Sequence, residues 1–169
     1  MNQPRRLTAL VAVVCLALLS FGLYLQHGVG LEPCPMCIVQ RYLMVLMALI
    51  AAVGAFIPAG RAQLVAVALM AALSAAGAFV AARQSWLQWF PPEAYSCGRD
   101  FYGMIETFPL KRAIPMIFRG SGDCTKIDWT FLGLSIANWS FIAFLAMGLL
   151  CVGLLVSQWR LRQTTPPPV

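Results

Sequence analysis

Charged side chains are scarce in this chain of 169 residues, because Asp, Glu, Lys and Arg together make up 11% of it. Soluble globular domains contain roughly 25% charged residues, and so little charge does not cover the surface of an ordinary water-soluble domain. Hydrophobic residues make up 60% of the chain, a proportion that excludes intrinsic disorder. These two proportions predict that lipid surrounds most of the protein.

Four apolar stretches are long enough to cross a membrane, since about 30 Å of hydrocarbon takes roughly 20 helical residues. We expect the first stretch to be retained as a span and not cleaved as a signal peptide, because its apolar region is long and lacks a clear cleavage site. The predicted fold is an all-α membrane protein, a four-transmembrane-helix bundle that forms a single domain. The predicted spans are about 7–25, 37–57, 64–82 and 139–156.

The basic residues near the span ends predict the orientation of the bundle. Lys and Arg concentrate in short cytoplasmic flanks, and the residues on one side are Arg5, Arg6, Arg61, Arg160 and Arg162. We therefore expect both termini and the 58–63 loop to be cytoplasmic. The net charge of +6 is not concentrated in a basic cluster. We therefore interpret the excess of basic residues as a signal of membrane orientation, and we expect no nucleic-acid partner.

Two loops then lie on the external side, about 26–36 and 83–138. The second is long and rich in aromatic and aliphatic residues between Cys97 and Cys124. We expect it to lie on the bilayer surface and to carry a short interfacial helix, with a small packed cap as the alternative.

The spans contain no charged residue well inside the membrane, which argues against a transporter because ion and proton pathways usually need such groups. Ser74, Gly77 and many alanines in the third span indicate close helix packing.

The predicted topology divides the six cysteines into two classes. Cys15 and Cys151 lie in the middle of spans, where a cysteine usually behaves as a small buried hydrophobic residue. The other four lie in the external loops, where disulfides persist if the exterior is the periplasm. These are Cys34, Cys37, Cys97 and Cys124.

A zinc site is the first alternative for the Cys34-Pro35-Met36-Cys37 motif, because this spacing supplies two of four ligands. A second closely spaced pair is missing and His27 is the only histidine, so we expect no metal. Inert structural disulfides are a stronger alternative, and the spacing of the cysteines does not exclude them.

The local chemistry of the motif nevertheless favours reactivity. Pro35 suits the first turn of a helix, and the amides and dipole at a helix N-terminus stabilise a thiolate. Arg41 follows Cys37 by four residues and therefore shares its helix face. Its guanidinium is suited to favour a thiolate and to donate to a carbonyl oxygen. The alternative for Arg41 is a residue that snorkels at the end of a span.

This pattern resembles the bacterial DsbB family of disulfide bond formation proteins. The resemblance runs from the first span to the fourth and includes Gln26-His27, Glu32-Pro33-Cys34, Cys37-Ile38 and Arg41. It continues through Cys97, Ser121-Gly122-Asp123-Cys124 and Trp129 to Trp139.

The resemblance implies a membrane thiol–disulfide oxidoreductase that reoxidises the periplasmic dithiol oxidase DsbA. It implies that electrons pass through two cysteine pairs to a membrane quinone, either ubiquinone or menaquinone, which sustains disulfide formation in periplasmic proteins. It further implies a bacterial inner membrane with both loops in the periplasm. There a DsbA-like protein would attack Cys97, and Cys124 would resolve the mixed disulfide and engage Cys34. Cys37 would then face the quinone, with Arg41 near a carbonyl. The implied partners are thus a DsbA-like oxidase, the quinone pool and the lipid bilayer.

One position departs from the family pattern. Some members carry a histidine near the start of the long loop, whereas this chain has Gln84. A proton-donating histidine is therefore not carried over, and Gln84 or Arg83 becomes a candidate to line a quinone pocket.

Two other classes stay open at this point. A quinone reductase of the vitamin K epoxide reductase type is expected to place its C-x-x-C late in the chain, unlike this one. A small tetraspan interaction protein would use its disulfides only to staple loops.

Overall fold

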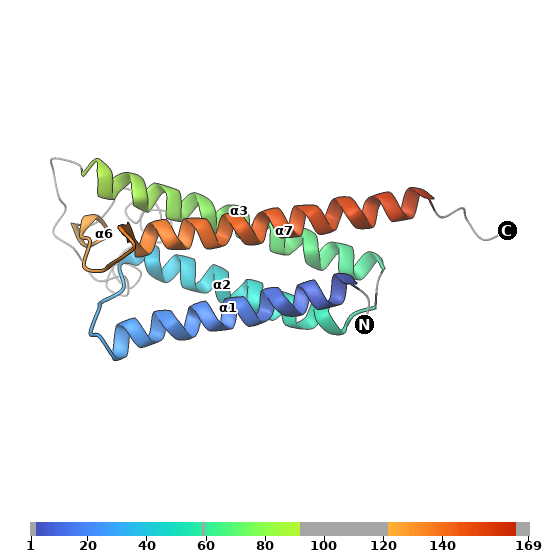
Figure 1. The fold of residues 1–169 in the computed structure, drawn as a ribbon, viewed down its shortest axis with the longest axis horizontal. Helices are drawn as coiled ribbons and strands as arrows, with labels where there is room; N and C mark the ends of the chain where they lie inside the picture. Colours follow the sequence, from blue (N-terminus) through green and yellow to red (C-terminus); the bar gives the residue numbers. More distant parts are fainter. Residues whose placement is uncertain (1–2, 59, 92–121, 165–169) are drawn as a thin grey trace, which may run out of the picture.

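The computed structural model describes residues 3–58, 60–91 and 122–164 (Figure 1). Within these ranges, four helices are long and apolar enough to cross a membrane, which confirms the predicted four-helix bundle. They are α1 (Gln3–His27), α2 (Pro35–Phe56), α3 (Arg61–Trp89) and α7 (Ile136–Thr164).

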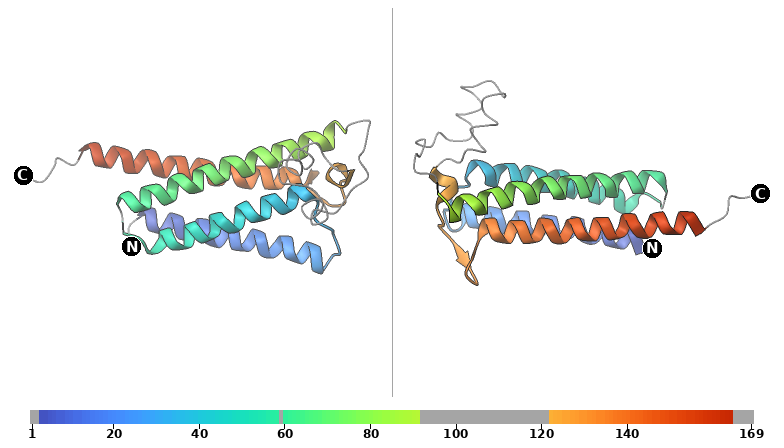
Figure 2. Two further views of the ribbon diagram at one scale, coloured as in Figure 1. Left: turned by 180° about the vertical axis from the view of Figure 1, so that it is seen from behind. Right: turned by 90° about the horizontal axis from the view of Figure 1, so that it is seen from above.

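The four helices run up and down, and each packs along the next one in the chain (Figures 1 and 2). Helix α1 packs on α2, α2 on α3 and α3 on α7, whereas α1 and α7 share few contacts within the described ranges. The two ends of the chain lie at the same end of the bundle. The opposite end carries the turn between α1 and α2, the single-turn helix α6 (Gly122–Thr125) and a small hairpin.

Helix α3 continues through residues 83–89, which the sequence had suggested to be part of the long external loop. The polar run from Arg83 to Ser85 looked like the end of a span. In the structure the helical repeat continues instead, because Val80, Gln84 and Leu87 all face the protein interior, with exposures of 4%, 4% and 2%. Helix α7 also extends beyond the predicted span, to Thr164.

A two-stranded hairpin precedes α7 and was not predicted. Strand β1 (Thr130–Phe131) pairs antiparallel with β2 (Leu134–Ser135), with Thr130 opposite Ser135. The two turn residues, Leu132 and Gly133, both have positive φ, at 52° and 78°. Two consecutive left-handed residues are the pattern of a tight type I′ turn, but leucine rarely adopts this conformation. Strands this short also carry no alternation that a sequence reveals. The interfacial helix expected between Cys97 and Cys124 falls on residues 92–121, outside the described ranges.

The interior of the bundle is closely packed where α3 meets α7. The Ser74 hydroxyl donates to the backbone carbonyl of Phe144, and a Cβ atom at Gly77 would collide with the Phe144 ring. The predicted role of Ser74 and Gly77 in helix packing is thus confirmed. The prediction that Cys15 and Cys151 are buried is also confirmed, because neither has any exposed surface.

Replacement of Gly77 tests this contact. We expect Gly77→Ala to destabilise the protein by about 1–3 kcal/mol, because the added methyl group has to displace the buried Phe144 ring. Gly153→Ala is the matched control in α7, since a Cβ atom there meets nothing within 4 Å. Thermal unfolding of both variants in detergent measures the difference. Equal stability of the two variants would contradict the packing described here.

Candidate functional site

The start of α2 is built from the Cys34–Cys37 motif. Cys34 is the N-cap residue, with φ −68° and ψ 161°, and Pro35 lies in the first turn. The Cys34 Sγ atom accepts a hydrogen bond from the backbone N–H of Cys37, at 3.3 Å. The sulfur therefore takes the place of the hydroxyl or carboxylate that usually caps a helix. The predicted position of Pro35 is confirmed.

The two cysteines of the motif face one another. Their Sγ atoms lie 2.6 Å apart as free thiols, Cys34 buried and Cys37 half-buried. A disulfide requires about 2.05 Å between the sulfurs. The two sulfurs are therefore adjacent, as a disulfide between them requires once an oxidant removes two electrons and two protons from the pair.

Cys124 brings a third sulfur to the same place. Helix α6 packs on α3 and buries Cys124 completely, in one apolar cluster with Cys34, Met36, Val80 and Leu87. A side-chain hydrogen bond joins Cys124 to Cys34 and raises the pKa of the Cys34 thiol well above its ordinary value. The hydrogen bond with Cys37 and the burial of Cys34 raise this pKa further. Cys34 is consequently held as a protonated thiol at neutral pH.

Gln84 holds the Cys34–Cys37 pair from the side of α3. Its Nε2 atom donates to both sulfurs, at 3.2 Å each, and its Oε1 atom accepts a hydrogen bond from Gln40 Nε2, at 2.7 Å. Sequence analysis named Gln84 only as a candidate for the lining of a quinone pocket. The position of Gln84 one helical turn from Val80 was the signal for its burial, and it required α3 to continue beyond residue 82.

Arg41 is fixed to α1. Its guanidinium donates from Nη1 to the Gln26 side-chain oxygen and from Nη2 to the Gly22 carbonyl, the latter at 3.0 Å. Arg41 and Cys37 lie on the same side of α2, as their spacing predicted, and both line one cavity. The guanidinium is thus held in a fixed position beside that cavity.

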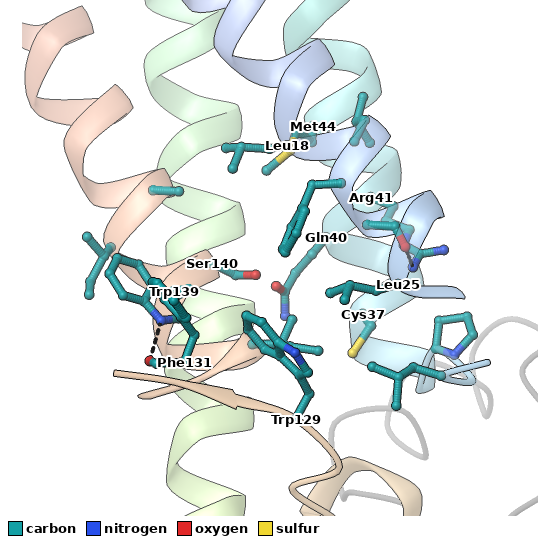
Figure 3. A pocket seen from close by; sticks show the side chains of 18 of the residues that line it. Leu18, Leu25, Cys37, Gln40, Arg41, Met44, Trp129, Phe131, Trp139 and Ser140 are labelled. Atoms are coloured by element: carbon teal, nitrogen blue, oxygen red, sulfur yellow. Dashed lines mark hydrogen bonds between the residues drawn. The ribbon is translucent and has the colours of Figure 1, made fainter. Parts of the chain in front are cut away.

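The cavity has a volume of about 800 Å³ and lies between α1, α2, α7 and the hairpin. Figure 3 shows Cys37, Gln40 and Arg41 of α2 on one side of it and Trp139 and Ser140 of α7 on the other. Most of the lining is apolar, and this part includes Leu18, Leu25, Met44, Trp129, Phe131 and Trp139. Neither Gln84 nor Arg83 is among the residues that line this cavity, although Gln84 contacts two of them, Cys37 and Gln40.

Aromatic contacts attach the hairpin to the bundle beside the cavity. Trp129 makes an edge contact with Phe21 of α1, with ring centroids 5.9 Å apart, and stacks with Phe131 at 6.1 Å. The Trp139 indole N–H donates to the Phe131 carbonyl, at 3.0 Å. Sequence analysis assigned no role to Trp129 or Phe131, because their approach to α1 depends on the hairpin.

The structure therefore gathers three of the four predicted sulfurs. Cys34, Cys37 and Cys124 lie together, while Cys97 falls outside the described residues. Cys37 belongs both to this sulfur cluster and to the cavity lining. Fold and site together define a multi-pass membrane protein with clustered redox-capable thiols beside an apolar cavity.

Comparison with known proteins agrees with this class. Residues 4–154 match the family described as disulfide bond formation protein DsbB. The chain is 67% identical to a disulfide bond formation protein B of Polaromonas sp. over 161 residues, 95% of each chain. It is 62% identical to one of Polaromonas naphthalenivorans, over 96% of this chain and 97% of that one. A relative from Azoarcus sp. is 54% identical, over 91% and 93% of the two chains.

The chain thus belongs to the DsbB family. As a disulfide bond formation protein it is a membrane disulfide oxidoreductase whose chemistry is thiol oxidation.

The raised pKa of Cys34 gives a testable pH dependence. In the reduced protein, we expect alkylation of Cys34 by a small reagent such as iodoacetamide to be slow at pH 7 and to accelerate only at strongly alkaline pH. Cys124→Ala removes the main cause and should move the midpoint of this profile to lower pH. Peptide mass spectrometry at a series of pH values measures it, with Cys151→Ala as the control. A profile that Cys124→Ala leaves unchanged would disprove the Cys34–Cys124 hydrogen bond.

Proposed function

We propose that this protein reoxidises a periplasmic dithiol oxidase of the DsbA type and passes the electrons to a membrane quinone. One observation carries the proposal. Cys37 joins the sulfur cluster to a large apolar cavity, so the residue that ends the thiol relay also faces the place where a lipid-soluble oxidant binds.

The first exchanges open both disulfides of the resting protein. A thiolate of the reduced partner attacks Cys97 in a Cys97–Cys124 disulfide, which forms a mixed disulfide and releases the Cys124 thiolate. Cys124 then attacks Cys34 in the Cys34–Cys37 disulfide, which forms a Cys34–Cys124 bond and releases the Cys37 thiolate. The burial of Cys124 against Cys34 supports this second exchange.

The remaining exchanges return the loop cysteines to their starting state. The second thiol of the partner attacks the mixed disulfide, which leaves the partner oxidised and Cys97 as a thiolate. Cys97 then attacks Cys124, which restores the Cys97–Cys124 bond and releases Cys34. The net result is one partner disulfide formed and the Cys34–Cys37 disulfide reduced to a dithiol.

The cavity fits a quinone with a hydrocarbon tail. Its volume of about 800 Å³ lies within the roughly 300–1,000 Å³ of typical ligand pockets. Its lining is mainly apolar, with a few polar groups that orient a ring, Gln40, Arg41 and Ser140. A bound quinone would supply the oxidising equivalents. It would accept the two electrons and two protons that the Cys34–Cys37 dithiol loses when it closes to a disulfide.

We assign Arg41 the role of orienting a carbonyl group in this cavity. Each terminal guanidinium nitrogen carries two N–H groups, and the hydrogen bonds to Gly22 and Gln26 engage these nitrogens from the side of α1. The guanidinium of Arg41 is therefore already ordered, and ligand binding does not cost the conformational entropy of fixing this side chain.

The bundle geometry supports an inner-membrane orientation with both termini cytoplasmic. Arg5 and Arg61 lie at the same end of the bundle as the two termini, and Arg5 Nε donates to the Ala55 carbonyl there, at 2.9 Å. The sulfur cluster lies at the opposite end, which we assign to the periplasm.

Kinetics test the proposed reaction directly. We expect Cys37→Ser to abolish quinone reduction by a reduced DsbA protein in membranes. Arg41→Met should raise the KM for quinone about ten- to a hundredfold, because a charged hydrogen bond is worth about 1.5–3 kcal/mol. Arg61→Met, an exposed arginine at the other end of the bundle, is the matched control. Unchanged rates in both the Cys37 and the Arg41 variants would defeat the proposed site.

Site-directed labelling tests the orientation. In a chain whose Cys34, Cys37, Cys97 and Cys124 are replaced by Ser, we introduce Asp128→Cys beside the hairpin and Arg61→Cys at the opposite end, both exposed positions. An impermeant maleimide should label the Asp128→Cys variant in intact spheroplasts. It should label the Arg61→Cys variant only after permeabilisation. The reverse pattern would place the sulfur cluster on the cytoplasmic side.

A further inference from the structure

A buried pair of amides supports the Cys34–Cys37 sulfurs. Gln40 and Gln84 are 5% and 4% exposed, and a buried amide is costly unless its polar atoms are paired. Gln40 Nε2 donates to Gln84 Oε1, at 2.7 Å. Because this bond occupies the Gln84 oxygen, the NH₂ group of Gln84 has to point to the other side, where the two sulfurs lie.

The NH₂ group of Gln84 matches the sulfur pair in number and position. It has two N–H donors, and its nitrogen lies 3.2 Å from Cys34 Sγ and 3.2 Å from Cys37 Sγ. A neutral thiol is a weak acceptor, whereas hydrogen bonds to an ionised group are roughly twice as strong as neutral ones. The amide thus favours the state in which one of these sulfurs carries negative charge.

The amide approaches the sulfurs from the side away from the cavity. Cys37 and Gln40 line the cavity and Gln84 does not. The hydrogen bond from Gln84 therefore leaves the cavity-facing side of Cys37 open to an oxidant. Arg41, the cation that the sequence placed beside Cys37, is hydrogen-bonded to α1 instead, through Gln26 and Gly22.

We propose that Gln84, oriented by Gln40, is a positioning residue that holds both sulfurs of the pair and stabilises negative charge on Cys37 when this sulfur is released as a thiolate. The proposal deepens the proposed function and rests on it for the step in which Cys37 is released. The donor is an amide, which does not titrate, so Gln84 can donate its hydrogen bonds to the sulfurs at every pH. The titratable groups around it, within the described residues, are the thiols of Cys34, Cys37 and Cys124.

The pH profile of Cys37 alkylation tests the proposal. Purified protein in detergent is reduced with dithiothreitol and treated with N-ethylmaleimide at a series of pH values, and peptide mass spectrometry follows Cys37. We expect Gln84→Met, which preserves length and removes the donors, to move the midpoint to higher pH by about one unit. Reagent access changes the rate and leaves the midpoint unmoved, so a merely structural role of Gln84 predicts no shift.

Two further variants complete the design. Gln40→Met leaves Gln84 in place but frees its amide to turn, so we expect a smaller shift in the same direction. Gln63→Met is the matched control, because Gln63 is a fully buried glutamine of the same helix whose amide has no hydrogen-bond partner among the described residues. It should leave the midpoint unchanged.

An unchanged midpoint in Gln84→Met would overturn the proposal, as would an equal shift in Gln63→Met. If Gln84→Met does not fold, Gln40→Met decides in the same way. The assay contains neither quinone nor a DsbA protein, so it is independent of the proposed reaction. A parent protein that fails to reduce quinone, while Gln84→Met still shifts the midpoint, would refute the proposed function and leave the thiolate support in place.

Discussion

The position at which α2 begins is the constraint on which the site depends. With Cys34 as the N-cap residue, the helical repeat places Cys37, Gln40, Arg41 and Met44 along one face of α2, and all four line the cavity. The N-cap itself lies just outside the helix and turns toward α3 and α6. A shift of the helix start by one residue would rotate this face by about 100° and separate the sulfurs from the cavity.

The two cysteines of the motif have different surroundings although three positions separate them. Cys34 is buried with Cys124, and the hydrogen bond between them keeps its proton. Gln84 donates to both sulfurs, but of the two only Cys37 opens onto the cavity. In thiol–disulfide exchange the leaving sulfur has to be stabilised as a thiolate, whereas the attacked sulfur does not carry this negative charge. In the relay that we propose, this asymmetry makes Cys34 the attacked sulfur and Cys37 the leaving one.

The features that depend on local sequence were predictable, and those that depend on distant contacts were not. Apolar length revealed the four spans, and Pro35 together with the i, i+4 spacing placed Cys37 and Arg41 on one helix face. The continuation of α3 to Gln84 was missed because three consecutive polar residues look like a span end until their burial is known. The hairpin turn at Leu132 was missed because its sequence carries no turn signature. Cys97 remains a prediction, since it lies outside the described residues.

The sparse contact between α1 and α7 has a consequence for how the cavity fills. Both helices line the cavity, beside the point where Cys15 of α1 contacts Met147 of α7, and in a membrane an opening between them would face the hydrocarbon of the bilayer. A hydrophobic molecule can then arrive sideways, by two-dimensional diffusion, without ever dissolving in water. Occupancy would follow the mole fraction of the molecule among the lipids, and acyl-chain order or bilayer thickness would set the rate of exchange.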